Sequence, residues 1–87
     1  MKRLRISVSG RVQGVFFRAS ARQEARRLGL TGFARNEPDG SVNIEVQGEA
    51  SSVKTFLTWA GHGSGLARVD EMAHEAIPLV SDETDFK

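Results

Sequence analysis

Hydrophobic periodicity in this chain switches repeatedly between the period of a strand and the period of a helix. Residues 4–8 and 42–47 alternate apolar and polar side chains, which predicts strands with one buried and one solvated face. Residues from about 18 to 28 and from 53 to 60 carry apolar side chains at intervals of three and four, which predicts amphipathic helices. Strands and helices of this kind bury their apolar faces by packing against one another.

Turn residues predict how these elements are connected. Residues 37–40, EPDG, have proline, aspartate and glycine in the order favoured in tight turns. Residues 30–36 and 42–47 are therefore expected to form a hairpin. Gly29 stands where helices usually end, so the first helix is expected to lie between the first strand and this hairpin.

The second half of the chain is expected to add another helix and another strand. Ser51 or Ser52 is expected to cap the helix, and residues 61–65, which include three glycines, to end it in a flexible connection. Residues 67–77 alternate irregularly, which predicts a strand that contains a bulge. A short final strand is expected at 84–87.

This order of elements predicts an α+β fold, namely a ferredoxin-like βαββαβ sandwich with an antiparallel sheet, strand order 4-1-3-2, and two helices on one face. Residues 1–87 are expected to form a single domain. The first and second strands then run parallel on either side of the third, so their C-terminal ends lie about 10 Å apart at one end of the sheet. The loop after the first strand should therefore lie beside Asn36, at the end of the second.

Composition narrows the chemistry that such a fold can carry. The chain has no cysteine, which excludes disulfides, thiolate metal sites and cysteine nucleophiles. His62 and His74 are isolated and the carboxylates lack ligand spacing, so no metal and no other cofactor is expected. The net charge of +1 disfavours a nucleic-acid partner. No apolar run is long enough to span a bilayer, and we expect a cytoplasmic monomer without a membrane partner.

The segment GRVQGVFFR, residues 10–18, connects the first strand to the first helix. A helix start gathers unpaired N–H groups and partial positive charge, which suits phosphate. Gly10 and Gly14 let the backbone approach an anion closely, and the Arg18 guanidinium can hold two phosphate oxygens. The spacing and the closing Lys-Ser/Thr of a Walker loop are absent. On the residues alone, a plain connector with turn glycines and a solvated arginine remains an alternative.

Three further side chains near this segment admit a structural or a functional interpretation. Phe16 and Phe17 cannot both face solvent at little cost, so at least one is expected in the core. Asn36 precedes a turn, where asparagine commonly serves the turn itself. Its expected position beside Arg18 favours a role at the same site.

These segments resemble the acylphosphatase family. Residues 10–18 are similar to its signature Gly-x-Val-Gln-Gly-Val-x-Phe-Arg, and GFARNEPDGSVNIEVQG, residues 32–48, resembles its second motif. The resemblance implies metal-independent hydrolysis of small acyl phosphates to carboxylate and inorganic phosphate. It implies that Arg18 and Asn36 are catalytic, with Arg18 binding phosphate oxygens and Asn36 positioning the attacking water. It also implies a phosphate cradle formed by the backbone of Gln13, Gly14, Val15, Phe16, Phe17 and Arg18.

Two alternatives belong to other function classes. An anion-binding module would keep the phosphate cradle without turnover. A nucleic-acid-binding ferredoxin-like domain would need exposed aromatic side chains on the central strands, where this sequence has arginine, serine, asparagine, glutamate and glutamine. Arg22, Arg26 and Arg27 give the first helix a basic face, which is either simply solvated or attracts anionic substrates.

Overall fold

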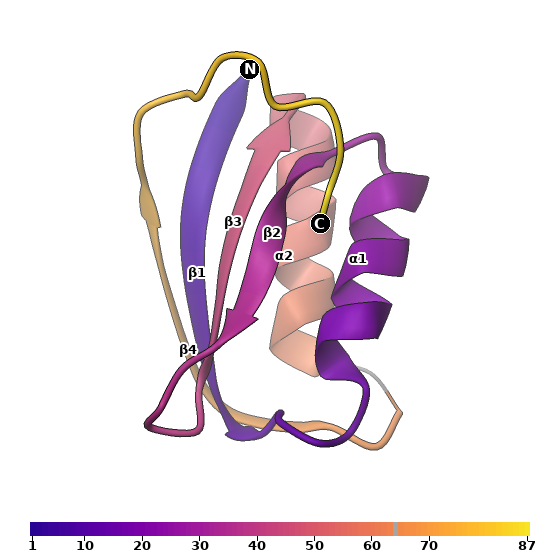
Figure 1. Ribbon diagram of the computed structural model, residues 1–87, viewed down its shortest axis with the longest axis vertical. Coiled ribbons are helices and arrows are strands. Elements are labelled where there is room, and N and C mark those ends of the chain that lie inside the picture. Colours follow the sequence, from indigo (N-terminus) through magenta and orange to yellow (C-terminus); the bar gives the residue numbers. More distant parts are fainter. Residues whose placement is uncertain (64) are drawn as a thin grey trace.

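The computed structural model describes residues 1–63 and 65–87. Over these residues the chain forms four strands and two helices in the predicted order (Figure 1). The elements are β1 (Lys2–Arg11), α1 (Phe17–Arg27), β2 (Thr31–Asn36), β3 (Val42–Gly48), α2 (Ala50–His62) and β4 (Arg68–Ala76). Neither helix in this part of the chain is long and apolar enough to cross a membrane.

The strands form an antiparallel sheet in the order β2-β3-β1-β4, and α1 and α2 lie side by side on one of its faces (Figure 1). This arrangement confirms the predicted α+β ferredoxin-like sandwich and its strand order. Ile6 lies opposite Ile44 and Val8 opposite Val42, and all four side chains are buried. Because directly opposed residues project to the same face, the apolar residues of β1 and β3 meet the helices together.

Aromatic rings join the two helices above the sheet. The Trp59 ring of α2 lies 5.4 Å from that of Phe17 and 5.5 Å from that of Phe56, measured between centroids. Phe17 and Phe56 are both buried. Such aromatic pairs contribute on the order of 1 kcal/mol each beyond the area they bury, and here they hold the start of α1 against α2.

The register between β1 and β4 shifts near one end of the pair. Ser9 lies opposite Glu71 but Gly10 lies opposite Val69, so Asp70 is an extra residue in β4, and the predicted bulge is confirmed. Gly10 has a φ of 123°, and a Cβ there would lie 2.3 Å from a carbonyl oxygen of β4, so only glycine fits. The bulge lies where β1 leads into the loop before α1.

The predicted serine cap of α2 is wrong. Glu49 occupies the capping position, its side chain makes no capping hydrogen bond within the described chain, and the helix begins at Ala50. The Val53 N–H donates to the Glu49 carbonyl oxygen at 2.9 Å, which closes the first helical turn. Ser51 and Ser52 therefore lie inside that turn, where their side chains cannot serve as the cap.

The connection expected at 61–65 begins as helix. α2 continues to His62, and the Gly63 N–H donates to the carbonyl oxygen of Trp59 at 2.8 Å. The predicted end of the helix was thus too early by two residues, because the glycine at the expected end is accommodated in the last turn. Ser64, which belongs to the same predicted connection, lies outside the described residues.

The final strand predicted at 84–87 is reduced to a single bridge. Phe86 pairs in parallel with Gly32 of β2, since Gly32 donates to the Asp85 carbonyl oxygen at 3.2 Å and Lys87 donates to the Gly32 carbonyl oxygen at 2.9 Å. The Phe86 side chain is fully buried. Burial of this ring holds the C-terminal segment beside β2 (Figure 1).

Charged side chains cluster on the sheet face opposite the helices. Arg3 of β1 is only 2% exposed and donates to Glu83 Oε1 at 2.8 Å and to Glu45 Oε1 at 3.0 Å. The pKa of the Glu83 carboxyl is lowered, chiefly by the hydrogen bond from Arg3 and to a smaller degree by the positive charge of Arg3. Gln47 of β3 exchanges two hydrogen bonds with the backbone of Val80. The segment after β4 is therefore held over one end of this face by polar contacts.

Glu83→Gln should lower the free energy of unfolding at pH 7 by about 2 kcal/mol, because the buried Arg3 guanidinium loses one of its carboxylate partners. The folded-state pKa of Glu83 lies below its ordinary value of 4.5. Its stabilisation is therefore present above that pH and is lost as pH falls through the folded-state pKa. Urea unfolding should show that the difference in free energy of unfolding between wild type and variant becomes smaller at acid pH.

The matched control for that variant is Glu75→Gln. Glu75 is 63% exposed and pairs with Arg5, itself 46% exposed, at 2.7 Å. Removing an exposed partner of this kind should change the free energy of unfolding by less than about 1 kcal/mol. A Glu83→Gln effect that is as small as the control, or that does not change with pH, would contradict the interpretation.

Candidate active site

Between β1 and α1 the chain passes through two left-handed residues. Gly14 has a φ of 73°, and Phe16 has a φ of 62° and a ψ of 21°, whereas Val15 between them has no positive φ. Alternation of this kind turns neighbouring N–H groups toward one side, as in the backbone nests that bind anions. A Cβ on Gly14 would meet nothing within 4 Å, so glycine is favoured there by the backbone conformation and not by crowding.

The amide groups of this loop are available to a ligand. Within the described chain, the N–H groups of residues 13–16 donate to no backbone or side-chain acceptor. No side chain of the described residues caps the start of α1 at Phe16, and no acidic residue lies in the first helical turn. The partial positive charge of the helix start is therefore uncompensated, and an anion with several oxygens can satisfy these groups.

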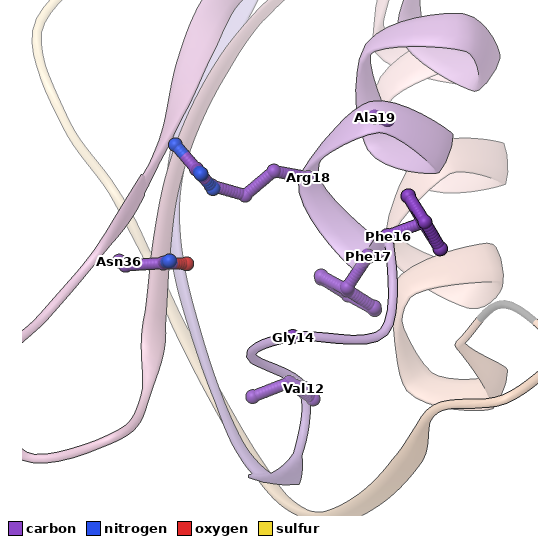
Figure 2. A pocket seen from close by; sticks show the side chains of 7 residues that line it. All are labelled: Val12, Gly14, Phe16, Phe17, Arg18, Ala19 and Asn36. Atoms are coloured by element: carbon purple, nitrogen blue, oxygen red, sulfur yellow. The ribbon is translucent and has the colours of Figure 1, made fainter.

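Arg18 and Asn36 face the same space from two elements (Figure 2). Arg18 extends from the first turn of α1 toward β2, and Asn36, the last residue of β2, points its amide toward the loop. The topology thus brings the loop and the end of β2 together, as the sequence predicted. The space between them is a hollow of about 270 Å³ lined by Val12, Gly14, Phe16, Phe17, Arg18, Ala19 and Asn36.

The lining of this hollow suits an anion. Its volume of about 270 Å³ is several times the roughly 30 Å³ that a water molecule takes up in the liquid, so a phosphoryl group and a water fit together. Among the residues that the structure describes, Arg18 is its only charged lining residue, and no carboxylate lines it. Over the residues that the structure describes, no group of three or more histidine or carboxylate side chains is placed to hold a metal ion.

The two phenylalanines of the loop have different environments. Phe17 is 1% exposed and packs on Trp59, whereas Phe16 is 77% exposed. The expectation that at least one of them belongs to the core is confirmed. Phe17 anchors the end of the loop in the core, and this fixes where the neighbouring Arg18 leaves the helix.

The Gln13 side chain ties the loop to the turn after β2. Its Nε2 donates to the carbonyl oxygens of Glu37 and Ser41, each at 2.9 Å. Inside that turn, the Ser41 hydroxyl and N–H donate to Asp39 Oδ1 at 2.6 and 2.9 Å and lower the pKa of the Asp39 carboxyl. Because Glu37 directly follows Asn36, these bonds set the separation between the loop and the end of β2.

This contact of the Gln13 side chain was not predicted from the sequence, where only the Gln13 backbone was expected to serve the phosphate cradle. The two acceptors are main-chain carbonyl groups 24 and 28 residues away. Every residue has such a carbonyl group, so the residue types do not indicate which one a distant side chain will bind. The available sequence signal for such a contact was that Gln13 is a polar residue between glycine and apolar residues of the loop.

Comparison with known proteins finds relatives along nearly the whole chain. A family model described as Acylphosphatase matches residues 4–87. A protein named Acylphosphatase from Marinobacter nauticus is 46% identical over 87 residues, which are 100% of this chain and 95% of the relative. Another of that name, from Methylococcus capsulatus, is 45% identical over 86 residues, which are 99% of this chain and 94% of the relative.

A solved structure agrees with these sequence matches. The crystal structure of acylphosphatase from Bacillus subtilis superposes with a TM-score of 0.93 at 31% identity, covering 99% of this chain and 96% of that one. Residues 4–87, which the family model matches, include the loop, α1 and β2, and therefore all the residues that line the hollow. The chain belongs to the acylphosphatase family.

Proposed function

We propose that the hollow between the loop and β2 is the active site at which this acylphosphatase-family hydrolase cleaves acyl phosphates without a metal. The reaction is R–CO–O–PO₃²⁻ + H₂O → R–COO⁻ + H₂PO₄⁻. One observation carries the assignment: the unpaired N–H groups of residues 13–16 and the Arg18 guanidinium lie around a space that Asn36 also faces. Because a carboxylate leaves easily, catalysis reduces to holding the phosphoryl group and orienting a water.

Arg18 and the loop backbone hold the phosphoryl group. The cradle is the backbone of residues 13–18, and the Arg18 fork binds two phosphoryl oxygens at once. Charge on these oxygens changes as the group passes to water, and donors fixed beforehand stabilise that change without reorganising. The proposal is supported by the left-handed conformations at Gly14 and Phe16 and by the anchoring of Phe17 in the core.

Asn36 positions the attacking water. Its side-chain oxygen accepts a hydrogen bond from the water and aims the lone pair at phosphorus. An amide is too weak a base to remove a proton near neutral pH, so Asn36 contributes orientation alone, and the departing proton passes to the phosphoryl oxygens. The Gln13 bonds to the turn after β2 support this role, since they hold Asn36 at a set distance from the cradle.

The active unit is a monomeric single domain, residues 1–87, that acts in the cytoplasm on a small molecule. All lining residues of the hollow come from α1, its preceding loop and β2 of one chain, so a second copy is not needed to complete the site. A chain without cysteine gains nothing from an oxidising compartment. Size-exclusion chromatography of the active protein should give the mass of one chain.

The test is hydrolysis of benzoyl phosphate by the wild-type chain with EDTA present. We expect release of benzoate and phosphate, competitive inhibition by inorganic phosphate, and a rate that is nearly constant between about pH 6 and 8, because the proposed mechanism uses neither a general acid nor a general base. Binding of phosphate without turnover would instead identify an anion-binding module. Activity that EDTA abolishes would contradict the metal-independent mechanism.

A further inference from the structure

A second hollow adjoins the proposed active site and shares Arg18 with it. It has a volume of about 250 Å³ and is lined by Arg18, Ala19, Arg22, Ala34 and Lys87. The Arg18 side chain crosses from α1 toward β2 (Figure 2) and lines both hollows. A group attached to a phosphoryl that Arg18 holds can therefore extend past Arg18 into this second space.

Two arginines of α1 face this space one helical turn apart. Arg18 and Arg22 are separated by four residues, so they share a face of the helix and differ by about 6 Å along its axis. Small side chains, Ala19 and Ala34, form the wall between the helix and β2. The hollow therefore has room for part of a ligand between the Arg18 and Arg22 side chains.

Two of the arginines of α1 form ion pairs with acidic side chains, and two others form none with the described residues. Arg26 pairs with Asp85 at 2.8 Å, and Arg27 pairs with Glu24 at 2.8 Å. Arg18 and Arg22, by contrast, form no ion pair with any residue that the structure describes. The helix thus neutralises the two arginines away from the hollow and leaves the two that line it free to bind an anion.

Asp85, two residues before Lys87 of this hollow, already accepts hydrogen bonds from other groups. Its Oδ1 and Oδ2 accept from Arg26 at 3.1 and 2.8 Å, and Oδ1 also accepts from the Phe86 N–H at 2.8 Å. These bonds and, more weakly, the charge of Arg22 lower the pKa of the Asp85 carboxyl. Arg22 therefore acts on Asp85 only at a distance and keeps its own hydrogen-bond donors.

We propose that the second hollow binds an anionic group on the acyl part of the substrate, with Arg22 as the specificity-determining residue. The preferred substrates are then acyl phosphates whose acyl group carries a distal carboxylate or phosphate. This inference rests on the proposed function, because the phosphoryl group must first occupy the loop. Phosphoryl and distal anion are held by Arg18 and Arg22 respectively, about one helical turn apart.

The test compares 3-carboxybenzoyl phosphate with its methyl ester, which differs by one methyl group and lacks the distal charge. The measured quantity is the ratio of kcat/KM for the acid to kcat/KM for the ester, in wild type and in Arg22→Gln. A charge-assisted contact at a partly exposed site should make this ratio about tenfold smaller in Arg22→Gln. Comparing ratios cancels the different reactivities of the two leaving groups.

Two variants distinguish binding of the distal anion in the second hollow from long-range electrostatic attraction of the substrate. Arg27→Gln removes one charge from the same helix away from the hollow, and should leave the ratio unchanged. Arg22→Lys keeps the charge without the fork, and should retain part of the preference. If Arg27→Gln lowers the ratio as much as Arg22→Gln does, long-range steering explains the effect and the subsite is wrong.

The remaining outcomes distinguish the two proposals. Hydrolysis of both substrates with an unchanged ratio in Arg22→Gln overturns the subsite and leaves the proposed function standing. Failure of wild type to hydrolyse either substrate overturns the proposed function and the subsite with it. The carboxylate can be replaced by a phosphate at the same ring position to show which distal anion is preferred.

Discussion

Arg18→Ala should lower kcat/KM for benzoyl phosphate by about a thousandfold. The variant loses the guanidinium that lines the hollow, which is proposed to be a preorganised donor pair for the phosphoryl oxygens. Because Arg18 is proposed to contact the phosphoryl group before and during reaction, the inhibition constant of inorganic phosphate should also rise, by about tenfold or more. Steady-state kinetics with phosphate as inhibitor measures both effects.

Two comparisons show whether the loss belongs to the guanidinium. Arg18→Lys restores the charge without the planar fork, and should recover only a small part of the rate. Arg27→Ala removes an exposed arginine of the same helix, and should leave the rate near that of wild type. Since Arg18 is exposed and makes no ion pair with the described residues, the free energy of unfolding should change by less than about 0.5 kcal/mol. A loss of less than tenfold would remove Arg18 from the mechanism.

Asn36→Ala should lower kcat by about a hundredfold or more while leaving phosphate affinity nearly unchanged. In the proposed mechanism the side chain positions water and does not hold the phosphoryl group, so its removal should cost orientation and not binding. The backbone of residue 36 pairs opposite Val42 in the hairpin, and alanine keeps that pairing. The measurement is kcat for benzoyl phosphate beside the inhibition constant of inorganic phosphate.

Asn36→Asp provides a second measurement at the same position. Aspartate has nearly the same shape and can accept from the water, but its negative charge repels the phosphoryl oxygens. We expect it to lose turnover and to weaken phosphate binding, unlike alanine. If Asn36→Ala instead weakens phosphate binding as strongly as Arg18→Ala does, Asn36 is a binding residue and the positioning role is wrong.

The parts of the fold that were predictable have strong local patterns. Alternation along β1 and β3 places Ile6 and Ile44 on one face whatever lies around them, and glycine and proline mark the hairpin turn. The serine cap of α2 and the strand at 84–87 were mispredicted because local preference did not decide them. Glu49 begins the helix without a side-chain cap, and burial of Phe86 places the C-terminal segment.

The order of strands and helices, and with it the meeting of the loop with the end of β2, followed from the sequence by itself, because periodicity and turn chemistry are local properties. Only the tertiary structure decided that Gln13 bridges to the turn after β2 and that Phe17, not Phe16, enters the core. It also decided that Arg26 is paired with Asp85, 59 residues away, while Arg22 forms no ion pair with the residues that the structure describes. Such pairings depend on which distant residues the fold brings within hydrogen-bonding distance, and no pattern of neighbouring residues contains that information.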